Sequence, residues 1–416
     1  MEIMRKITIQ EKFRIWLDMN QLLVHSTILT FVGISFLVSD WGFSLFSFGE
    51  LILIPLLPVV FLLAMDSFNK KDWTLLTSVG ILVILHLSFQ QFLNSELLIR
   101  PAIAASVKIA FFTTFIFSFF KYVIKFKLQR RFLIILNIIG IISIAIGAYI
   151  YIAIISEQLP FEFLWKFTRI DERSYFFRNT RYLVRMRSLF SEPAHFGFFL
   201  NTLLGINLLQ NTRIKIPVIL NGLLMISILF TFSFSSISIM VLVLFLYTIK
   251  IIFTNVKSVK FNLLQIIIII VTIGLIIYFT WDFIAIAIIQ RAEEIVTGQD
   301  NSALERIVGS WKYVNSNTIW LGNGFGNTPI IWNNFAYFLS DGGIVFFILS
   351  ILGTFYIMYI NLGLGIFFIL MNFQRGGYLS PTFSLFLVVI LLYASQWKII
   401  ENKLIRTNNL WRNSID

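Results

Sequence analysis

Two polar stretches of an otherwise apolar chain carry an arginine that is followed by a glycine sixteen positions later. The pairs are Arg181 with Gly197 and Arg306 with Gly322. An arginine side chain stays charged and can donate two parallel hydrogen bonds to phosphate oxygens. Glycine lets the backbone turn tightly beside a ligand. The two stretches therefore predict a site for a phosphate-bearing substrate.

The first stretch has no acidic residue between its arginines, which are Arg173, Arg178, Arg181, Arg185 and Arg187. In a helix, positions 178, 181 and 185 would share one face. Such a row of cations repels itself unless an anion lies against it. It predicts either a clamp for a pyrophosphate or an interfacial helix that contacts anionic lipid.

The same stretch ends in Ser191, Glu192, Pro193 and His195, directly before an apolar span. Ser191 is the expected N-cap of that span, with Glu192 and Pro193 in its first turn. The Glu192 carboxylate, which lies beside the arginines, is also a candidate to accept a proton from an attacking hydroxyl group. His195 alone cannot form a metal site, so we expect it to make hydrogen bonds at the membrane interface.

The second stretch begins with the cation Arg291 and contains a capping box from Ser302 to Glu305. Apolar residues repeat there at helical spacing, at Leu304, Ile307, Val308, Trp311 and Val314. They predict a short amphipathic helix on the membrane surface or across the mouth of the bundle. Arg306 falls outside its apolar face, so we expect it to contact polar groups, including the substrate.

Glycines alternate with other residues in the segment that holds Gly322, Asn323, Gly324, Gly326 and Asn327. The exposed N–H groups of such a segment, together with the two asparagine amides, suit an anion or hydroxyl groups. A turn that returns the chain to the bilayer is the alternative. The segment is not a nucleotide P-loop, because no Gly-Lys-Ser/Thr follows it.

Composition limits the fold that must position these residues. Hydrophobic residues make up 58% of the 416 residues and charged residues only 13%. The apolar runs are about 20 residues long, as in transmembrane helices, and lack the alternating pattern of barrel strands. The sequence predicts an all-α polytopic membrane protein with a single integral domain over residues 1–416. The absence of cysteine excludes disulfides and thiolate metal ligands, and we expect neither a metal nor a cofactor.

Eleven apolar runs mark candidate spans, at residues 22–39, 43–65, 73–93, 101–120, 132–155, 195–210, 216–233, 235–253, 263–281, 335–371 and 380–397. A break in the long run near Gly353 or Asn361 would give 12 spans instead of 11. The remaining long loops are 156–194 and 282–334. Two ionisable residues inside the spans, Glu50 and Lys108, would form a reasonable pair across helices.

The net charge of +12 comes largely from lysine and arginine in short loops. The positive-inside rule then places those loops and both termini in the cytoplasm, which favours 12 spans, and both long loops on the extracytoplasmic face. Residues 1–20 are polar and basic and predict an amphipathic turn at the inner surface. No basic and aromatic surface domain is present to bind nucleic acid.

Taken together, these features resemble the Wzy-type polysaccharide polymerases of the O-antigen polymerase and ligase superfamily. The resemblance rests on the paired arginine-to-glycine spacings and on a few further motifs, namely Arg-Ser-Leu-Phe-Ser-Glu-Pro at 187–193, Ser-Phe-Ser-Ser at 233–236, Leu-Gly-Asn-Gly-Phe-Gly-Asn at 321–327, Asn334 and Gly-Gly-Ile at 342–344.

The resemblance implies a GT-C-like, metal-independent glycosyltransferase in a bacterial plasma (inner) membrane, serving capsule, exopolysaccharide or O-antigen synthesis. Its donor and acceptor would be glycans on undecaprenyl pyrophosphate, and membrane lipid, a chain-length regulator and a flippase would be further partners. The implied catalytic residues are Glu192 as base, with Arg187 and Arg306. Pyrophosphate would be bound by Arg178, Arg181, Arg185 and Arg291. Residues that contact sugar or shape the loops would be His195, Gly197, Gly322, Asn323, Gly324, Gly326, Asn327 and Asn334.

Two alternatives remain open. The related ligases place a histidine beside an asparagine at the end of the second loop, where this chain has Asn333 and Asn334. This difference favours polymerisation over transfer to another acceptor. A flippase or other transporter would be expected to show an internal repeat and charges at mid-membrane.

Overall fold

A computed structural model gives the fold of the chain. It describes residues 9–43, 46–95, 97–161, 175–177, 180–211, 214, 216–255, 293–295, 297, 299, 304–306, 308–329 and 331–395. The predicted span at 263–281 lies outside the described residues.

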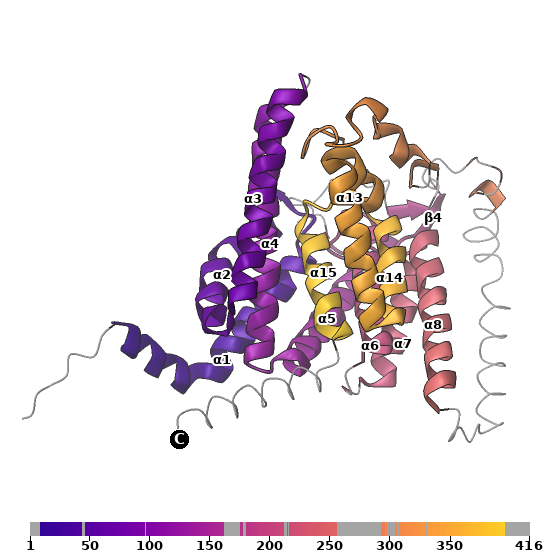
Figure 1. Cartoon of the computed structure of the whole chain (residues 1–416). Coiled ribbons are helices and arrows are strands. Elements are labelled where there is room, and N and C mark those ends of the chain that lie inside the picture. Colours follow the sequence, from indigo (N-terminus) through magenta and orange to yellow (C-terminus); the bar gives the residue numbers. More distant parts are fainter. Residues whose placement is uncertain are drawn as a thin grey trace, which may run out of the picture.

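Helices dominate the described part and alternate in direction along a bundle (Figure 1). The α-helices are α1 (Ile9–Leu37), α2 (Phe48–Ala64), α3 (Lys70–Leu93), α4 (Ile99–Lys125), α5 (Gln129–Ser156), α6 (Pro193–Leu209), α7 (Val218–Phe230), α8 (Phe234–Asn255), α13 (Asn334–Ile360), α14 (Leu362–Gln374) and α15 (Pro381–Ala394). Short 3₁₀ helices are η1 (Met65–Ser67), η5 (Gly309–Tyr313) and η6 (Ser316–Thr318). Two antiparallel hairpins complete the description, β1 (Gly42–Phe43) with β2 (Phe46–Ser47) and β3 (Phe176–Phe177) with β4 (Thr180–Val184).

Six of the described helices are long and apolar enough to cross a membrane, and five shorter apolar helices lie among them. This confirms the prediction of an all-α polytopic membrane protein. The long apolar run breaks at Asn361, one of the two predicted positions, where the side chain accepts a hydrogen bond from Leu364 N and caps α14. The first helix differs from the prediction, since it begins at Ile9 and runs without interruption to Leu37.

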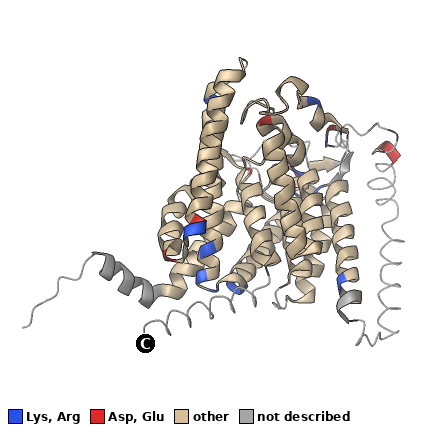
Figure 2. Ribbon diagram, in the orientation of Figure 1, with Lys and Arg blue, Asp and Glu red and all other residues tan. Residues whose placement is uncertain are grey.

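The bundle has two different ends. Lysine and arginine gather at the lower end in the view of Figure 2, which we call the basic end. Two cations there are paired, Lys121 with Asp72 at 2.7 Å and Lys125 with Asp66 at 3.4 Å. The β3–β4 hairpin and residues 308–333 lie at the opposite end, which we call the loop end (Figure 1). This separation agrees with the charge pattern of the sequence.

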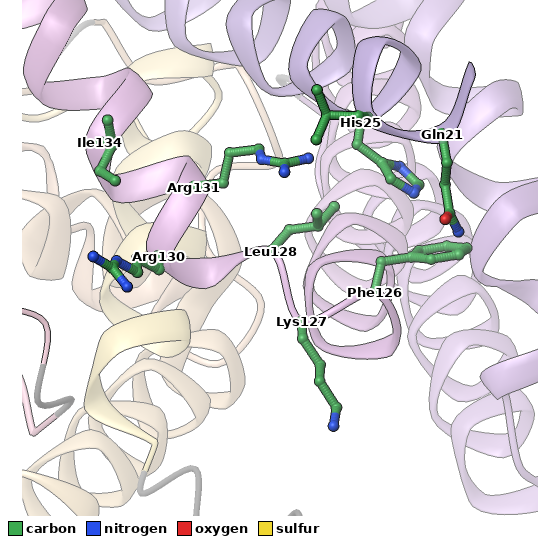
Figure 3. Close-up of a pocket in the computed structure, with 9 residues that line it drawn as sticks. Gln21, His25, Phe126, Lys127, Leu128, Arg130, Arg131 and Ile134 are labelled. Atoms are coloured by element: carbon green, nitrogen blue, oxygen red, sulfur yellow. The ribbon is translucent and has the colours of Figure 1, made fainter. Parts of the chain in front are cut away.

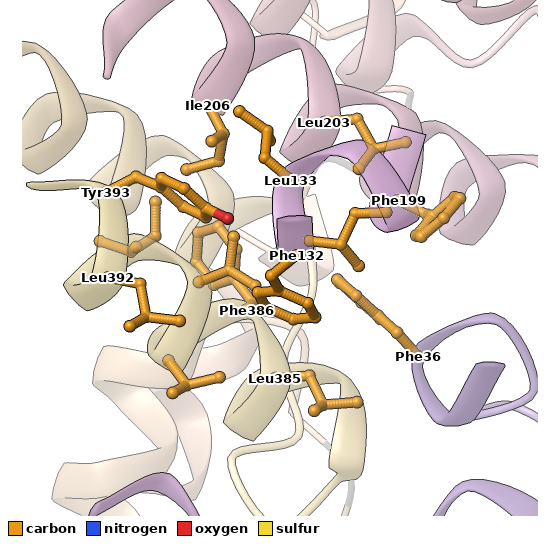
Figure 4. Close-up of a cluster of buried hydrophobic side chains, with 14 of the residues drawn as sticks. Phe36, Phe132, Leu133, Phe199, Leu203, Ile206, Leu385, Phe386, Leu392 and Tyr393 are labelled. Atoms are coloured by element: carbon orange, nitrogen blue, oxygen red, sulfur yellow. The ribbon is translucent and has the colours of Figure 1, made fainter. Parts of the chain in front are cut away.

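The centre of the bundle is α6, which packs against α5, α7, α8, α14 and α15. Of its 17 residues, 14 are buried, so it is a core helix with no face of its own for lipid. Figure 4 shows the apolar cluster around it, in which Phe199 and Leu203 lie with Phe36, Phe132 and Phe386 from other helices. A helix held on all sides gives a rigid position to the residues at its first turn, Glu192 to His195.

Two local predictions are wrong. Arg181 lies in strand β4, not in a helix that would align three arginines. Aromatic and β-branched residues at alternate positions, Thr180, Tyr182 and Val184, explain the strand. The predicted amphipathic helix is interrupted as well, since residues 304–306 are helical but the chain restarts as η5 at Gly309.

Candidate functional site

Four polar side chains from distant parts of the chain meet at the loop end. We call Asp40, Ser191, His195 and Arg375 the Asp40 cluster. Asp40 follows α1, Ser191 precedes α6, His195 lies in the first turn of α6, and Arg375 follows α14. The linker that carries Asp40 is held to the first long loop by Trp41, whose Nε1 donates to Leu189 O at 2.8 Å.

Asp40 is the acceptor for the other three side chains. Its Oδ2 lies 2.9 Å from His195 Nδ1 and accepts a hydrogen bond from Ser191 Oγ at 3.1 Å. Its Oδ1 accepts from Nη2 of Arg375. Both carboxylate oxygens therefore accept hydrogen bonds. The Asp40 carboxylate joins the linker after α1, the first long loop and the connection between α14 and α15.

The cluster is buried and keeps its charges. The side chain of Asp40 is only 4% exposed, and that of Arg375 11%. Burial by itself would raise the pKa of Asp40, but Arg375 and His195 in direct contact outweigh burial and hold this pKa well below its usual range. Asp40 is therefore ionised at neutral pH, and an ionised carboxylate can only accept hydrogen bonds.

The cluster resembles a catalytic serine triad in its residue types but not in its geometry. In a triad, one ring nitrogen of the histidine contacts the carboxylate and the other contacts the serine. Here His195 Nδ1 contacts both Asp40 Oδ2 and Ser191 Oγ, at 2.9 Å each. The Ser191 hydroxyl therefore donates its hydrogen bond to Asp40 and not to the histidine. This arrangement indicates a histidine that is held in position, and not an activated serine nucleophile.

The second long loop joins the same place through the backbone of Arg375. Nδ2 of the predicted site residue Asn334 donates to Arg375 O at 3.2 Å and to Asn372 Oδ1 at 2.8 Å. A Cβ at Gly376 would overlap Ile331 O, so only glycine lets the two segments approach this closely. Arg375 therefore connects the ends of both long loops, its side chain through Asp40 and its carbonyl through Asn334.

Two predicted arginines hold the first loop in position. Arg187 is 1% exposed, and its Nη1 donates to Ser191 O at 2.7 Å while its guanidinium lies 3.9 Å from the centre of the Tyr175 ring. Arg185 is half-buried, and its Nε donates to Thr231 O at 3.2 Å. A guanidinium group stays protonated in proteins, so the two arginines bring fixed positive charge to the segment before α6.

Glu192 is half-buried and is the N-cap residue of α6, where Ser191 was expected. Its carboxylate makes no hydrogen bond to the N–H groups of that helix, and Pro193 occupies the first helical position. Capping therefore does not account for Glu192. The prediction of Ser191 as the cap is wrong, because its hydroxyl is bound in the Asp40 cluster.

Gly197 lies at the closest approach of α6 to α8. A Cβ at this position would overlap the Ser236 side chain, whose Oγ also accepts from Gln374 Nε2 at 2.9 Å. Asn201 Nδ2 donates to Ser236 O at 2.9 Å. The Ser-Phe-Ser-Ser motif begins in the turn between α7 and α8 and continues into the first turn of α8. Its last serine, Ser236, connects α6, α8 and α14.

The glycine segment turns its donors inward, onto a buried carboxylate of α13. Gly326 N donates to Asp341 Oδ2 at 3.0 Å and Thr328 N to Asp341 Oδ1 at 3.2 Å, while Gly324 N donates to Asp341 O at 3.0 Å. Tyr378 OH adds a hydrogen bond to Asp341 Oδ2 at 2.9 Å. The carboxylate and the backbone carbonyl of Asp341 therefore occupy these donors, in place of an external anion.

The asparagines of this segment also make internal contacts. Asn323 Nδ2 donates to Tyr313 O at 2.9 Å, and Asn327 Nδ2 donates to Asn323 O at 3.0 Å. Gly322 has a φ of 73° and meets the backbone of α13, where Gly343 has a φ of 69° and interrupts the helix. The segment is a tightly packed turn, and contacts with sugar remain a prediction for these residues.

The remaining predicted site residues are only partly placed. Arg306 is half-buried in the helical turn at 304–306. Arg181 lies in β4, but its side chain falls outside the described part, and Arg178 and Arg291 lie outside it altogether. The expected meeting of arginines from both long loops therefore stays a prediction.

The sequence prediction missed Asp40 and Arg375. A signal for both was present, because with 12 spans each falls in a short extracytoplasmic loop, and an arginine there departs from the positive-inside pattern. Opposite charges in two loops on one side of the membrane suit a pair. The expected pair of Glu50 and Lys108 is confirmed, with Lys108 Nζ 2.7 Å from Glu50 Oε1.

Among the described residues, no group of three or more histidine, aspartate or glutamate side chains is placed to hold a metal ion. The site therefore combines a buried anion, several fixed cations, an anchored histidine and a carboxylate at the N-cap of α6. Comparison with known proteins adds no assignment, because no protein-family model, curated protein or solved structure matches the chain.

Proposed function

We propose that this protein is a glycosyltransferase that polymerises oligosaccharide repeat units linked to undecaprenyl pyrophosphate. The reaction takes place at the outer face of a bacterial plasma membrane, with the loop end outside and both termini in the cytoplasm. The proposal rests on the motifs shared with Wzy-type polymerases and on the geometry of the loop end.

The observation that carries the proposal is the junction at Arg375. Its Nη2 binds Asp40, whereas its buried Nη1 has no hydrogen-bond partner among the described residues. A buried donor without an acceptor costs about 1–3 kcal/mol. A pyrophosphate oxygen bound to this donor would remove that cost, which is a physical reason for an anionic substrate at the point where both long loops meet.

The reaction needs a base and fixed positive charge. The acceptor hydroxyl oxygen forms a bond to C1 of the donor sugar, and the bond between C1 and the pyrophosphate oxygen breaks. The pyrophosphate keeps the electron pair, and the hydroxyl proton passes to the base. Glu192 is the proposed base, since its carboxylate is not used for capping.

Arginines stabilise the departing pyrophosphate in this proposal. Arg185, Arg306 and Arg375 would do so directly, together with Arg178, Arg181 and Arg291. Arg187 is the most buried of them and would act by fixing the carbonyl of Ser191, one residue before the proposed base. His195, anchored by Asp40, would orient the acceptor sugar.

The test uses purified full-length protein in liposomes with lipid-linked repeat units as the sole substrate. Glu192→Gln keeps the size of the side chain but removes the base, and Arg306→Gln removes a cation. We expect each to lower the rate of chain extension by roughly 100-fold or more. The matched controls are Glu157→Gln, an exposed carboxylate at the end of α5, and Lys312→Gln, an exposed cation of η5.

The controls should extend chains at the wild-type rate. Wild-type rates in both Glu192→Gln and Arg306→Gln would refute the site assignment. A wild-type protein that makes no ladder from repeat units alone, but transfers glycan once another acceptor is supplied, would instead be a ligase. Movement of lipid-linked glycan across the liposome membrane without any new bond would indicate a transporter.

A further inference from the structure

A pocket of about 640 Å³ lies at the basic end, far from the Asp40 cluster along the bundle. It is formed where α1 passes the connection between α4 and α5 (Figure 3). Among the described residues that line it, none is acidic, and four carry or can carry positive charge: His25, Lys127, Arg130 and Arg131. Figure 3 shows Arg131 extending toward the helix that carries His25.

The two arginines of the pocket differ from the other cations nearby. Lys121 and Lys125 at the same end are paired with aspartates. Arg130 and Arg131 form no ion pair with any carboxylate in the part of the chain that the structure describes. Adjacent cations repel each other, so their placement at one pocket is unfavourable until an anion is bound.

The start of α5 adds to this positive potential. Both arginines lie in the first turn of the helix, and its N-cap residue, Leu128, makes no side-chain hydrogen bond to the N–H groups of that turn. The N-terminus of a helix carries a partial positive charge, and its free N–H groups favour an anion.

A buried polar atom independently indicates a ligand. His25 is 5% exposed, and its Nδ1 lies within hydrogen-bond distance of Tyr122 OH, at 2.5 Å. Its Nε2 is buried and has no hydrogen-bond partner among the described residues, although His25 lines the pocket. A buried polar atom without a hydrogen-bond partner destabilises the folded protein unless a bound ligand or water supplies that partner.

We infer that this pocket binds the phosphate group of an anionic molecule, with Arg131, Arg130 and the first turn of α5 contacting the phosphate oxygens and His25 Nε2 contacting a polar atom beside them. The phosphate of an anionic membrane lipid suits the location, since basic pockets between transmembrane helices bind such head groups. Inorganic phosphate offers the same oxygens from the aqueous side. The inference is independent of the proposed catalytic activity.

The experiment compares two double variants of the full-length protein. Arg130→Gln with Arg131→Gln removes two charges from the pocket. Lys70→Gln with Lys71→Gln removes two charges from exposed residues at the same end, outside the pocket. Each protein is purified in a neutral detergent, and retained phosphatidylglycerol or phosphatidylcholine is measured by native mass spectrometry as lipid is titrated.

We expect wild-type protein to retain phosphatidylglycerol in preference to phosphatidylcholine. The pocket variant should need on the order of 30-fold more phosphatidylglycerol for half-saturation, and the lysine variant about as much as wild type. Displacement of the lipid by millimolar inorganic phosphate would support a pocket that also accepts soluble phosphate, and persistence of the lipid would support a lipid site. Equal retention of phosphatidylglycerol by the two double variants, or of both lipids by wild type, would overturn the inference.

Discussion

Two buried aspartates lie at the loop end, and they are held in opposite ways. Asp40 is surrounded by side chains from distant parts of the chain, two of them able to carry positive charge. Asp341 contacts no cation among the described residues and instead accepts from backbone N–H groups of the glycine segment and from Tyr378. Both have full sets of hydrogen bonds, but only one is part of an ion network.

The difference separates a candidate reaction site from its scaffold. The contacts of Asp341 hold the glycine segment against α13, the helix that follows it in the chain. Asp40 joins segments more than 300 residues apart and leaves one guanidinium donor of Arg375 without an acceptor among the described residues. An ion network that is not fully satisfied is costly for the folded state, and a substrate anion would explain why it is kept.

The largest expected loss of stability comes from Arg375→Leu. This change leaves Asp40 buried without its strongest partner, and breaking a buried ion pair costs about 3–5 kcal/mol. Unfolding by denaturant in detergent micelles measures the change. The double variant Asp40→Asn, Arg375→Leu should recover much of the loss, because no unpaired charge remains, and a double variant as unstable as the single one would contradict the pairing.

The contact of the glycine segment with α13 should be almost as sensitive. Gly343→Ala would place a Cβ against Trp320 O and Gly322 N, both backbone atoms, at a φ of 69°. We expect a loss of about 3 kcal/mol in unfolding free energy. Gly353→Ala is the matched control in the same helix, where a Cβ meets no atom within 4 Å, and it should stabilise the protein by about 0.5–1 kcal/mol.

Asparagine substitutions compare the two aspartates directly. Asp341→Asn replaces an acceptor oxygen by an NH₂ group that faces a donor, which should cost about 1–3 kcal/mol. The folded fraction should keep its rate of chain extension, because only the scaffold is affected. Asp40→Asn should instead lower the rate per folded molecule, as His195 and Arg375 lose their fixed charge partner. Equal rates in the two variants would remove the distinction between the two regions.

The smallest expected effect is the dependence of the unfolding free energy on pH below neutrality. The pKa of Asp40 lies below its usual value in the folded protein, so the ion network stabilises the protein fully above the unfolded-state pKa of about 3.9. This stabilisation is lost as the pH falls below that value, by up to about 1.4 kcal/mol per pH unit. Between pH 5 and 8, Asp40 should contribute no slope. A stability profile of Asp40→Asn that matches wild type at pH 3 to 4 would contradict this.

Much of the architecture follows from local patterns in the sequence. Apolar runs of span length identify the helices, and Asn361 marks a break because its side chain can cap the next helix. Charge alone distinguishes the two ends of the bundle. Glu50 and Lys108 were predictable as a pair because isolated charges inside spans need partners.

The centre of the candidate site was harder to predict, because its contacts are set by tertiary structure. Nothing local relates Asp40 to Arg375, which are 335 positions apart. Ser191 has the residue type of an N-cap, but its hydroxyl is bound to the Asp40 carboxylate. The N-cap residue of α6 is instead Glu192. The spacing of Arg178, Arg181 and Arg185 suits a helix, but the neighbouring aromatic and β-branched residues favour a strand.

In the proposed reaction, the loop end releases a lipid pyrophosphate as it joins two glycans. The most direct measurement is the amount of free undecaprenyl pyrophosphate formed when purified wild-type protein is supplied with lipid-linked repeat units alone. We expect one freed lipid pyrophosphate for each new glycosidic bond in the growing ladder. Polymer that grows without this release, or no polymer from active, folded protein, would contradict it.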